Sequence, residues 1–258
     1  MERIKKLFQL KGKVAIVTGS SKGIGEAIAR GLAEHGAKVV ISSRKQESVD
    51  EVVEQFKKDG LEAVGIACHV GKAEQREALV KNTIEHYGGV DILVNNAAIN
   101  PVFGPIEQAD DIVFDKLMDV NVKAPWALSN LALPSMKERG GGSIINVSSV
   151  EGMHPGMGLG LYSVSKAAIL MLSKNQAKEW GKYGIRSNVL CPGLIKTKLS
   201  SALWQNEGLL KHLENNIPSG RIGMPDEMAG LVVLLASDAG AYMTGGVYTA
   251  DGGYLIAG

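Results

Sequence analysis

Short runs of β-branched residues alternate with longer amphipathic stretches from residue 14 to residue 193. A parallel sheet with crossover helices produces this alternation, because a helix must carry the chain back before the next parallel strand begins. The expected strands are 14–18, 38–42, 62–68, 92–95, 143–148, 186–191 and 247–250. The sequence therefore predicts an α/β fold, a doubly wound parallel sheet of about seven strands with helices on both faces.

Helices are expected over six stretches of the 258-residue chain: 24–35, 45–58, 73–87, 110–138, 160–180 and 226–236. No internal repeat, low-complexity tract or interdomain linker interrupts them. An α/β chain of this length is commonly one unit, so residues 1–258 are expected to form a single domain.

Composition excludes several classes of protein. The net charge is +1, with Lys and Arg scattered, so no basic stripe is present to bind nucleic acid. No apolar run is long enough to cross a bilayer, and the N-terminal residues lack a secretory signal, which favours a cytoplasmic protein. Cys68 and Cys191 lie in apolar strand-like segments, as buried thiols do, and no metal site is expected.

One segment departs from the alternation. Residues 194–218 follow the sixth strand and carry many leucines without a matching strand. They form either a mobile apolar flap over a ligand site or a pair of surface helices. Because ligands of open α/β sheets bind beyond the carboxyl ends of the strands, we favour the flap.

A glycine-rich loop, Thr18-Gly19-Ser20-Ser21-Lys22-Gly23-Ile24-Gly25, stands between the first strand and the first helix. Glycines at such a junction allow backbone amides to approach a pyrophosphate at the positive helix N-terminus. A glycine triplet alone marks only a turn, but this position makes it a strong indication of dinucleotide binding.

The end of the second strand indicates which dinucleotide is bound. An NAD site usually carries an acidic residue there, but this chain has Ser43, Arg44 and Lys45. Arg44, together with Lys22, suits the 2′-phosphate of NADP(H), although both could be solvated surface charges. NADP(H) is therefore the preferred cofactor, with NAD(H) possible.

A phenol and an ammonium group, Tyr162 and Lys166, are four residues apart on an expected helix and share one face. A free tyrosine has a pKa of about 10, and a neighbouring cation helps it to exchange a proton near neutral pH. Alone, this spacing is more often an ordinary helix face. Ser149 closes the fifth strand at the place where a substrate carbonyl would lie. Ser148 is the alternative, because only one of two successive side chains can point into the pocket. Asn121 is either a water-holding or a structural residue.

Taken together, these motifs resemble the classical short-chain dehydrogenase/reductase family in order and spacing. The motifs are the loop at 18–25, Asn95-Asn96-Ala97-Ala98, Asn121, Ser149, Tyr162 with Lys166, and Pro192-Gly193. A closer likeness, in 42–46, 68–74, 100–101 and 193–197, is to the NADPH-dependent carbonyl reductase/retinal reductase branch, whose members reduce aromatic ketones, α-dicarbonyls and retinal. The chain lacks the peroxisomal signal that ends the animal members of that branch.

The resemblance implies a Rossmann-like domain with a catalytic tetrad of Asn121, Ser149, Tyr162 and Lys166. Tyr162 would give its proton to the substrate oxygen, Ser149 would polarise that oxygen, Lys166 would lower the pKa of Tyr162, and Asn121 would anchor a relay water. Besides Tyr162 and Lys166, the expected cofactor-binding residues are Gly19, Ser21, Lys22, Gly23, Ile24, Gly25, Ser43, Arg44, His69, Val70, Asn95, Ala97, Pro192, Gly193, Ile195 and Thr197.

Three questions about function stay open at this stage. The motifs equally allow a 3-oxoacyl carrier-protein reductase or a hydroxysteroid dehydrogenase, whereas an enoyl reductase expects a wider Tyr-to-Lys spacing. A silent cofactor-sensing or scaffold protein would keep the fold without the activity. Glu151, Met153, His154 and Met157 either line the substrate pocket or are ordinary loop residues.

The helix after Tyr162, apolar on nearly every face, favours the homotetramer usual in the family.

Overall fold

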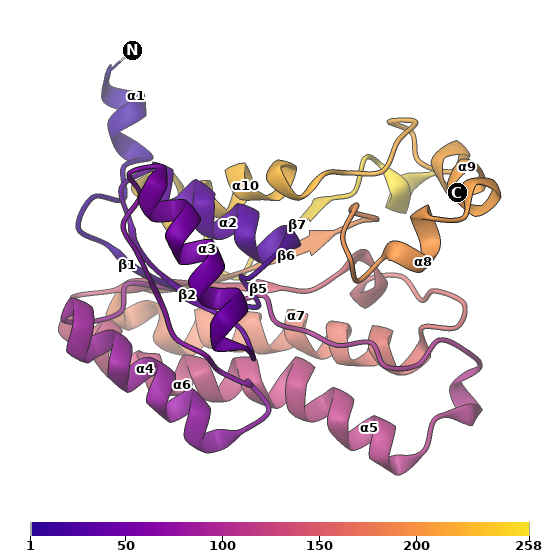
Figure 1. Ribbon diagram of the computed structural model, residues 1–258, viewed down its shortest axis with the longest axis horizontal. Helices are drawn as coiled ribbons and strands as arrows, with labels where there is room; N and C mark the ends of the chain where they lie inside the picture. The colour runs from indigo at the N-terminus through magenta and orange to yellow at the C-terminus, as the bar shows by residue number, and fades with distance from the viewer. Residues whose placement is uncertain (1, 258) are drawn as a thin grey trace.

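Seven parallel strands form one sheet in the computed structural model, which describes residues 2–257 (Figure 1). Their order across the sheet is β3-β2-β1-β4-β5-β6-β7, so the chain starts in the middle and extends to both edges. The strands are β1 (Val14–Thr18), β2 (Lys38–Ser42), β3 (Ala63–Gly65), β4 (Ile92–Asn95), β5 (Gly142–Val147), β6 (Ile185–Pro192) and β7 (Val247–Ala250). The predicted fold class and number of strands are confirmed.

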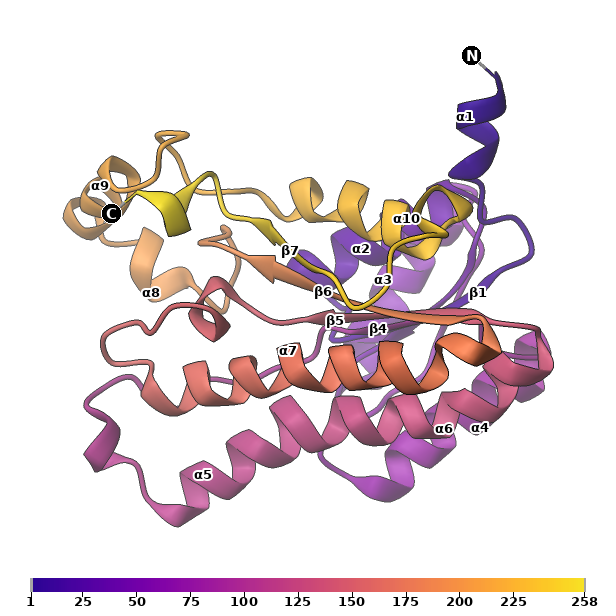
Figure 2. The same ribbon diagram turned by 180° about the vertical axis from the view of Figure 1, so that it is seen from behind.

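Helices cover both faces of the sheet, as Figures 1 and 2 show from opposite sides. One face carries α2 (Gly23–Glu34), α3 (Gln46–Lys58) and α10 (Ala229–Ala236), and the other carries α4 (Ala73–Tyr87), α5 (Asp111–Met118), α6 (Ala124–Glu138) and α7 (Gly160–Trp180). Alternate residues of β1 face opposite layers: Ala15 and Val17 belong to the core under α2, whereas Ile16 belongs to the core under α6.

All five residues of β1 are buried, which explains its continuous apolar sequence. Cys68 and Cys191 are both free and buried, as predicted. Within residues 2–257, no helix has both the length and the apolar character needed to span a membrane.

The expected helix over 110–138 is wrong in one respect, because a π-helical turn over Asp119–Lys123 separates α5 from α6. The side chain of Asn121, inside this turn, exchanges two hydrogen bonds with the backbone of Ile99, each 2.9 Å long. A π-turn changes the direction of a helix, and here it is held by contacts with a distant loop.

The prediction also needs correction for one strand and one additional helix. The third strand was expected over 62–68, but β3 is limited to Ala63–Gly65 at the edge of the sheet, where only β2 can pair with it. A short helix that the sequence pattern did not predict, α1 (Glu2–Leu7), precedes β1 and projects from the body of the molecule (Figure 1).

Residues 194–218 contain two short helices, α8 (Ser201–Trp204) and α9 (Glu207–Asn215), joined to β6 by a loop. They lie beyond the carboxyl end of the sheet, near the C-terminus of the chain (Figure 1). This segment, called the flap below, is therefore placed where a ligand of such a sheet would bind.

Candidate active site

Tyr162 and Lys166 lie on the first turns of α7, next to the carboxyl end of β5. Lys166 is only 3% exposed, and its Nζ donates a hydrogen bond of 2.9 Å to the carbonyl oxygen of Val147. The same Nζ lies 5.7 Å from the centre of the Tyr162 ring, which is partly buried. The predicted pair therefore shares one face of the helix, as their spacing requires.

The structure distinguishes the two serines at the end of β5. Ser148 is buried, and its Oγ donates to the carbonyl oxygen of Lys166 at 2.7 Å, so this hydroxyl is used in packing. The hydroxyl of Ser149 instead lies beside the phenol of Tyr162, where it lowers the pKa of the phenol. Ser149, not Ser148, therefore stands next to the tyrosine.

The net shift of the Tyr162 pKa is opposite to the one expected. Burial raises it from 10.0 to about 12, and the negative charge of Glu151 adds to the increase. Burial also lowers the pKa of Lys166 from 10.5 to about 8, because the charged form of an amine loses its hydration in the interior. Desolvation is therefore the largest influence on the pKa of both residues.

Asn121 reaches the same region from the π-turn between α5 and α6. It is 1% exposed, and its Nδ2 donates to Ser165 Oγ at 3.1 Å in addition to the two bonds with Ile99. The amide side chain thus holds the turn against α7.

The glycine loop is shaped before any ligand arrives. Gly19 and Gly23 have φ angles of 66° and 61°, which other residues rarely adopt, and a Cβ at Gly25 would overlap the carbonyl oxygen of Gly19. The Asn96 side chain donates to the carbonyl oxygens of Thr18, at 2.9 Å, and of Gly19, at 3.2 Å. These contacts hold the backbone close to the start of α2.

A phosphate group fits the start of α2. No side chain caps the helix there, so its first amides are open to an anion, and the helix dipole favours negative charge. The residues present thus fit the dinucleotide that the sequence predicts.

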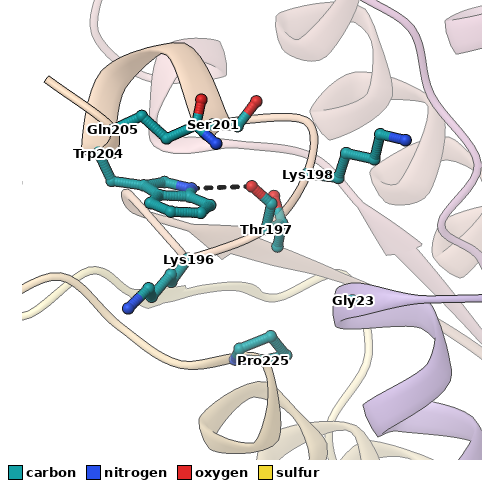
Figure 3. Close-up of a pocket in the computed structure, with 8 residues that line it drawn as sticks. All are labelled: Gly23, Lys196, Thr197, Lys198, Ser201, Trp204, Gln205 and Pro225. Atoms are coloured by element: carbon teal, nitrogen blue, oxygen red, sulfur yellow. Dashed lines mark hydrogen bonds between the residues drawn. The ribbon is translucent and has the colours of Figure 1, made fainter.

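A cavity of about 620 Å³ lies between the glycine loop and the flap (Figure 3). Trp204 of α8 closes one side of it, and the indole Nε1 donates to the carbonyl oxygen of Thr197 at 2.8 Å. Its lining residues are Gly23, Lys196, Thr197, Lys198, Ser201, Trp204, Gln205 and Pro225. Thr197, a predicted cofactor residue, lies next to Gly23 in the wall of this cavity, since a Cβ at Gly23 would be 3.4 Å from Thr197 Cγ2.

The remaining predicted cofactor residues occupy three places. Ser43 and Arg44 follow β2, and Arg44 is exposed. The backbone N–H of Cys68 donates a hydrogen bond of 2.8 Å to the carbonyl oxygen of Ser43, which brings His69 and Val70 close to the end of β2. Pro192 is the last residue of β6, and Gly193 and the buried Ile195 follow it.

Asn95 is placed differently from its neighbours after β4. Its side chain is turned inward and donates to Asn146 Oδ1 at 2.8 Å, so it supports the sheet. Ala97 N donates to Thr18 Oγ1 at 3.1 Å, which ties the end of β4 to the glycine loop. Within residues 2–257, no cluster of three or more His, Cys, Asp or Glu residues is placed to bind a metal ion.

Comparison with known proteins identifies the family of the chain. Residues 19–255 match a family model described as enoyl-(acyl carrier protein) reductase. Dehydrogenase/reductase SDR family member 4 of Oryctolagus cuniculus is 48% identical over 95% of this chain and 94% of its own length, and that of Homo sapiens is 46% identical over 95% and 88%. The chain belongs to the short-chain dehydrogenase/reductase family. It resembles the member 4 branch of that family and is an NAD(P)-dependent oxidoreductase.

Solved structures of the family have the same architecture. A gluconate 5-dehydrogenase from Burkholderia cenocepacia, crystallised with NADP and tartrate, superposes with a TM-score of 0.94 at 34% identity, covering 98% of this chain and 99% of that one. A putative NAD(P)-dependent gluconate 5-dehydrogenase from Beutenbergia cavernae, with bound NADP, gives a TM-score of 0.92 at 33% identity, covering 97% and 99%.

Sequence reasoning missed the roles of several supporting residues in this short-chain dehydrogenase/reductase. Ser165 holds Asn121, and Trp204 holds Thr197. Ser163 is 8% exposed, and its Oγ has no hydrogen-bond partner. The only available signal for Ser163 and Ser165 was their position beside Tyr162 and Lys166 on one helix.

Proposed function

We propose that the protein is an NADP(H)-dependent oxidoreductase that interconverts a ketone or aldehyde and an alcohol, with Tyr162 as general acid and base. The observation that carries this proposal is the position of the Tyr162 phenol, which lies close to both Ser149 and Lys166 at the carboxyl end of β5. A phenol placed there meets the oxygen of a carbonyl bound at the carboxyl edge of the sheet.

Each residue of the site has a separate role in the proposed reaction. A nicotinamide cofactor, when bound, would supply the hydride for the carbonyl carbon. Ser149 donates a hydrogen bond to the carbonyl oxygen, and Tyr162 transfers its proton to that oxygen. Lys166 stabilises the phenolate left behind, and the backbone carbonyl of Asn121 holds the water through which a new proton returns.

The preference for NADP(H) over NAD(H) rests on charge at the end of β2. Arg44 and Lys22 are both exposed and cationic, and no carboxylate stands among residues 42–45, where NAD-specific proteins hold the ribose hydroxyl. A guanidinium group is well suited to a 2′-phosphate, to which it can donate two parallel hydrogen bonds. The two related dehydrogenases described above, whose structures contain NADP, agree with this preference.

The substrate is proposed to enter between two loops that meet next to Tyr162. Gly104 N donates to the Gly158 carbonyl oxygen at 3.0 Å, and these loops carry exposed apolar side chains, Phe103 at 71% and Met157 at 94%. Apolar side chains in such a place favour a carbonyl compound with an apolar body over a sugar.

Three broader predictions belong to the same proposal. The chain forms a single domain in which the flap moves over the bound cofactor, and four chains associate as a homotetramer. A cytoplasmic location agrees with two buried cysteines that form no disulfide.

The decisive experiment measures oxidation of NADPH and of NADH against aryl ketones, α-dicarbonyls, 3-oxoacyl thioesters, steroids and sugar acids. The wild-type protein is expected to reduce apolar ketones or α-dicarbonyls, with a higher kcat/KM for NADPH. Tyr162→Phe removes the proton donor but keeps the ring, so its kcat is expected to fall by about 10²-fold to 10⁴-fold. Tyr183→Phe, which changes an exposed tyrosine far from the site, is the matched control.

Full activity of Tyr162→Phe would exclude the proposed mechanism, and complete inactivity of the wild-type protein would favour a sensing or scaffold role. A higher kcat/KM for NADH would overturn the cofactor preference alone.

A further inference from the structure

Ser20, the third residue of the glycine loop, is fully buried, with an exposed fraction of 0%. Its Oγ donates to the carbonyl oxygen of Val17 at 2.6 Å and accepts a hydrogen bond of 2.9 Å from the backbone N–H of Ser42. The N–H of Ser20 in turn donates to the carbonyl oxygen of Ser42 at 3.0 Å. Two hydrogen bonds, one in each direction, therefore join the glycine loop to the last residue of β2.

These bonds extend the contact between β1 and β2 past the point where the two strands can pair. The pairing ends with Thr18 opposite Ser42, and the loop then turns at Gly19, whose φ angle is 66°. A hydroxyl group can donate and accept at the same time, so the side chain of Ser20 serves as one more partner for the backbone at this junction. Without the hydroxyl, residue 20 would bond to Ser42 only through its backbone N–H.

The two segments that Ser20 joins are assigned to different parts of the cofactor in the proposed function. Gly23, three residues after Ser20, begins α2, where the diphosphate is proposed to lie. Arg44, two residues after Ser42, is proposed to hold the 2′-phosphate of NADP(H). Because Ser20 is fully buried, it can influence either site only through the backbone that it holds.

We propose that Ser20 is a positioning residue that fixes the separation between the diphosphate site at the start of α2 and the 2′-phosphate site at Arg44, and so sets the preference for NADP(H) over NAD(H). The inference rests on the proposed function, because it requires that Arg44 binds the 2′-phosphate. A ligand held at two points gains the full benefit of the second contact only where the protein already holds both points at the correct separation. NAD(H) lacks the 2′-phosphate, so its binding depends less on that separation.

The test is the equilibrium binding of three probes, NADP⁺, NAD⁺ and adenosine 2′-monophosphate, measured by calorimetry in the absence of substrate. Ser20→Ala removes the hydroxyl and leaves the backbone bond in place. Its Kd for NADP⁺ is expected to rise by about tenfold, whereas its Kd for NAD⁺ should stay within about threefold of wild type. Adenosine 2′-monophosphate can reach Arg44 but lacks the diphosphate, so its Kd should not change.

Two controls separate this effect from a general loss of stability. Ser42→Ala removes a neighbouring hydroxyl that makes no hydrogen bond within residues 2–257, and it keeps the backbone bonds to Ser20. Ser143→Ala removes another buried hydroxyl, which donates to the carbonyl oxygen of Leu235 at 2.8 Å near the amino end of β5, away from the glycine loop. Both variants should keep the wild-type ratio of the Kd values for NADP⁺ and NAD⁺.

A second variant at the same position keeps the proposal testable if Ser20→Ala does not fold. Ser20→Cys has a similar shape, but a thiol forms weaker hydrogen bonds than a hydroxyl. We expect the same selective rise in the Kd for NADP⁺, smaller than in Ser20→Ala.

An unchanged Kd for NADP⁺, or a rise that is equal for NADP⁺ and NAD⁺, would overturn the proposal. So would an equal rise for adenosine 2′-monophosphate, since Ser20 would then act on the Arg44 site alone. These outcomes leave the proposed function intact as long as the wild-type protein binds NADP⁺ more tightly than NAD⁺. A wild-type protein that binds the two equally would instead remove the proposed cofactor preference, and this inference with it.

Discussion

Lys166 illustrates the conflict between stability and chemistry at a single residue. Its ammonium group is almost completely buried and has one hydrogen bond, to Val147, while its pKa is lowered from 10.5 to about 8. A lowered pKa means that folding disfavours the charged form that Lys166 carries at neutral pH. The residue therefore costs the fold stability, and catalysis is the proposed reason for that cost.

We predict that Lys166→Met increases the stability of the protein while abolishing its activity. The lowered pKa corresponds to a gain of at most about 3 kcal/mol at pH 7, reduced by the lost bond to Val147. The gain should be present below about pH 8 and disappear as the pH rises towards 10.5, where the lysine is neutral in both states. Urea denaturation at a series of pH values measures it.

Lys174→Met, at an exposed position of the same helix, is the control and should change stability little at any pH. A Lys166→Met protein that is less stable than wild type at neutral pH would contradict the prediction.

At the residue scale, the sequence predicts which side chains form the candidate site better than it predicts the contacts that those side chains make. The spacing of Tyr162 and Lys166 predicted their shared face, because helix geometry is local. The same pattern could not choose between Ser148 and Ser149, since that choice depends on how α7 packs against β5. The buried position of Glu151 likewise depends on Gly156 and Ser163, which meet it only in the folded chain.

The flap is the element whose motion the proposed function requires. Its first turn is held by two side chains: Trp204 Nε1 donates to the Thr197 carbonyl at 2.8 Å, and Ser200 Oγ donates to the Ile195 carbonyl at 2.5 Å. No residue of α9 is buried, so this helix has little apolar contact to hold it in place. An element with few buried contacts opens at low cost in free energy.

We predict that trypsin cleaves the native protein first in the flap, after one of the exposed lysines Lys196, Lys198 or Lys211. NADPH should slow this cleavage, because the cofactor would hold Thr197 against the glycine loop. Trp204→Phe keeps the aromatic ring but removes the hydrogen bond, so it should be cleaved faster. Mass spectrometry of early fragments identifies the sites, and first cleavage elsewhere, or no effect of NADPH, would argue against a mobile flap.

At the element scale, strands with strong apolar runs were predicted closely, and β1, β2, β4 and β7 agree with their expected ranges. The break between α5 and α6 was not predictable from periodicity, because an extra residue in a π-turn keeps the segment helical. It depends on bonds from Asn121 to Ile99, and these exist only once the loop after β4 lies against the helix.

On the scale of the whole molecule, α5, α6 and α7 lie together on one face of the sheet (Figure 2). Their outer surface exposes large apolar side chains, among them Ile112 at 76%, Trp126 at 50% and Met171 at 58%. Apolar residues gathered on adjacent helices favour association with another chain. This surface is where the proposed homotetramer would bury its helices.

We predict that Met171→Asp, which places a charge on that surface, dissociates the homotetramer into smaller species. Light scattering after gel filtration should give about four times the mass of one chain for wild type and a smaller mass for the variant. Ile4→Asp, which changes an exposed apolar residue on α1, should keep the wild-type mass. A monomeric wild-type protein would rule out the predicted assembly.

The strand order also has a consequence for the synthesis of the protein. The chain completes β1, β2 and β3 by Gly65, but β4, the other neighbour of β1, begins only at Ile92. Throughout that interval a nascent chain on the ribosome presents one edge of β1 without a partner, and unpaired edges of apolar strands aggregate readily. The first third of this protein is therefore the part most in need of protection by a chaperone until β4 has emerged.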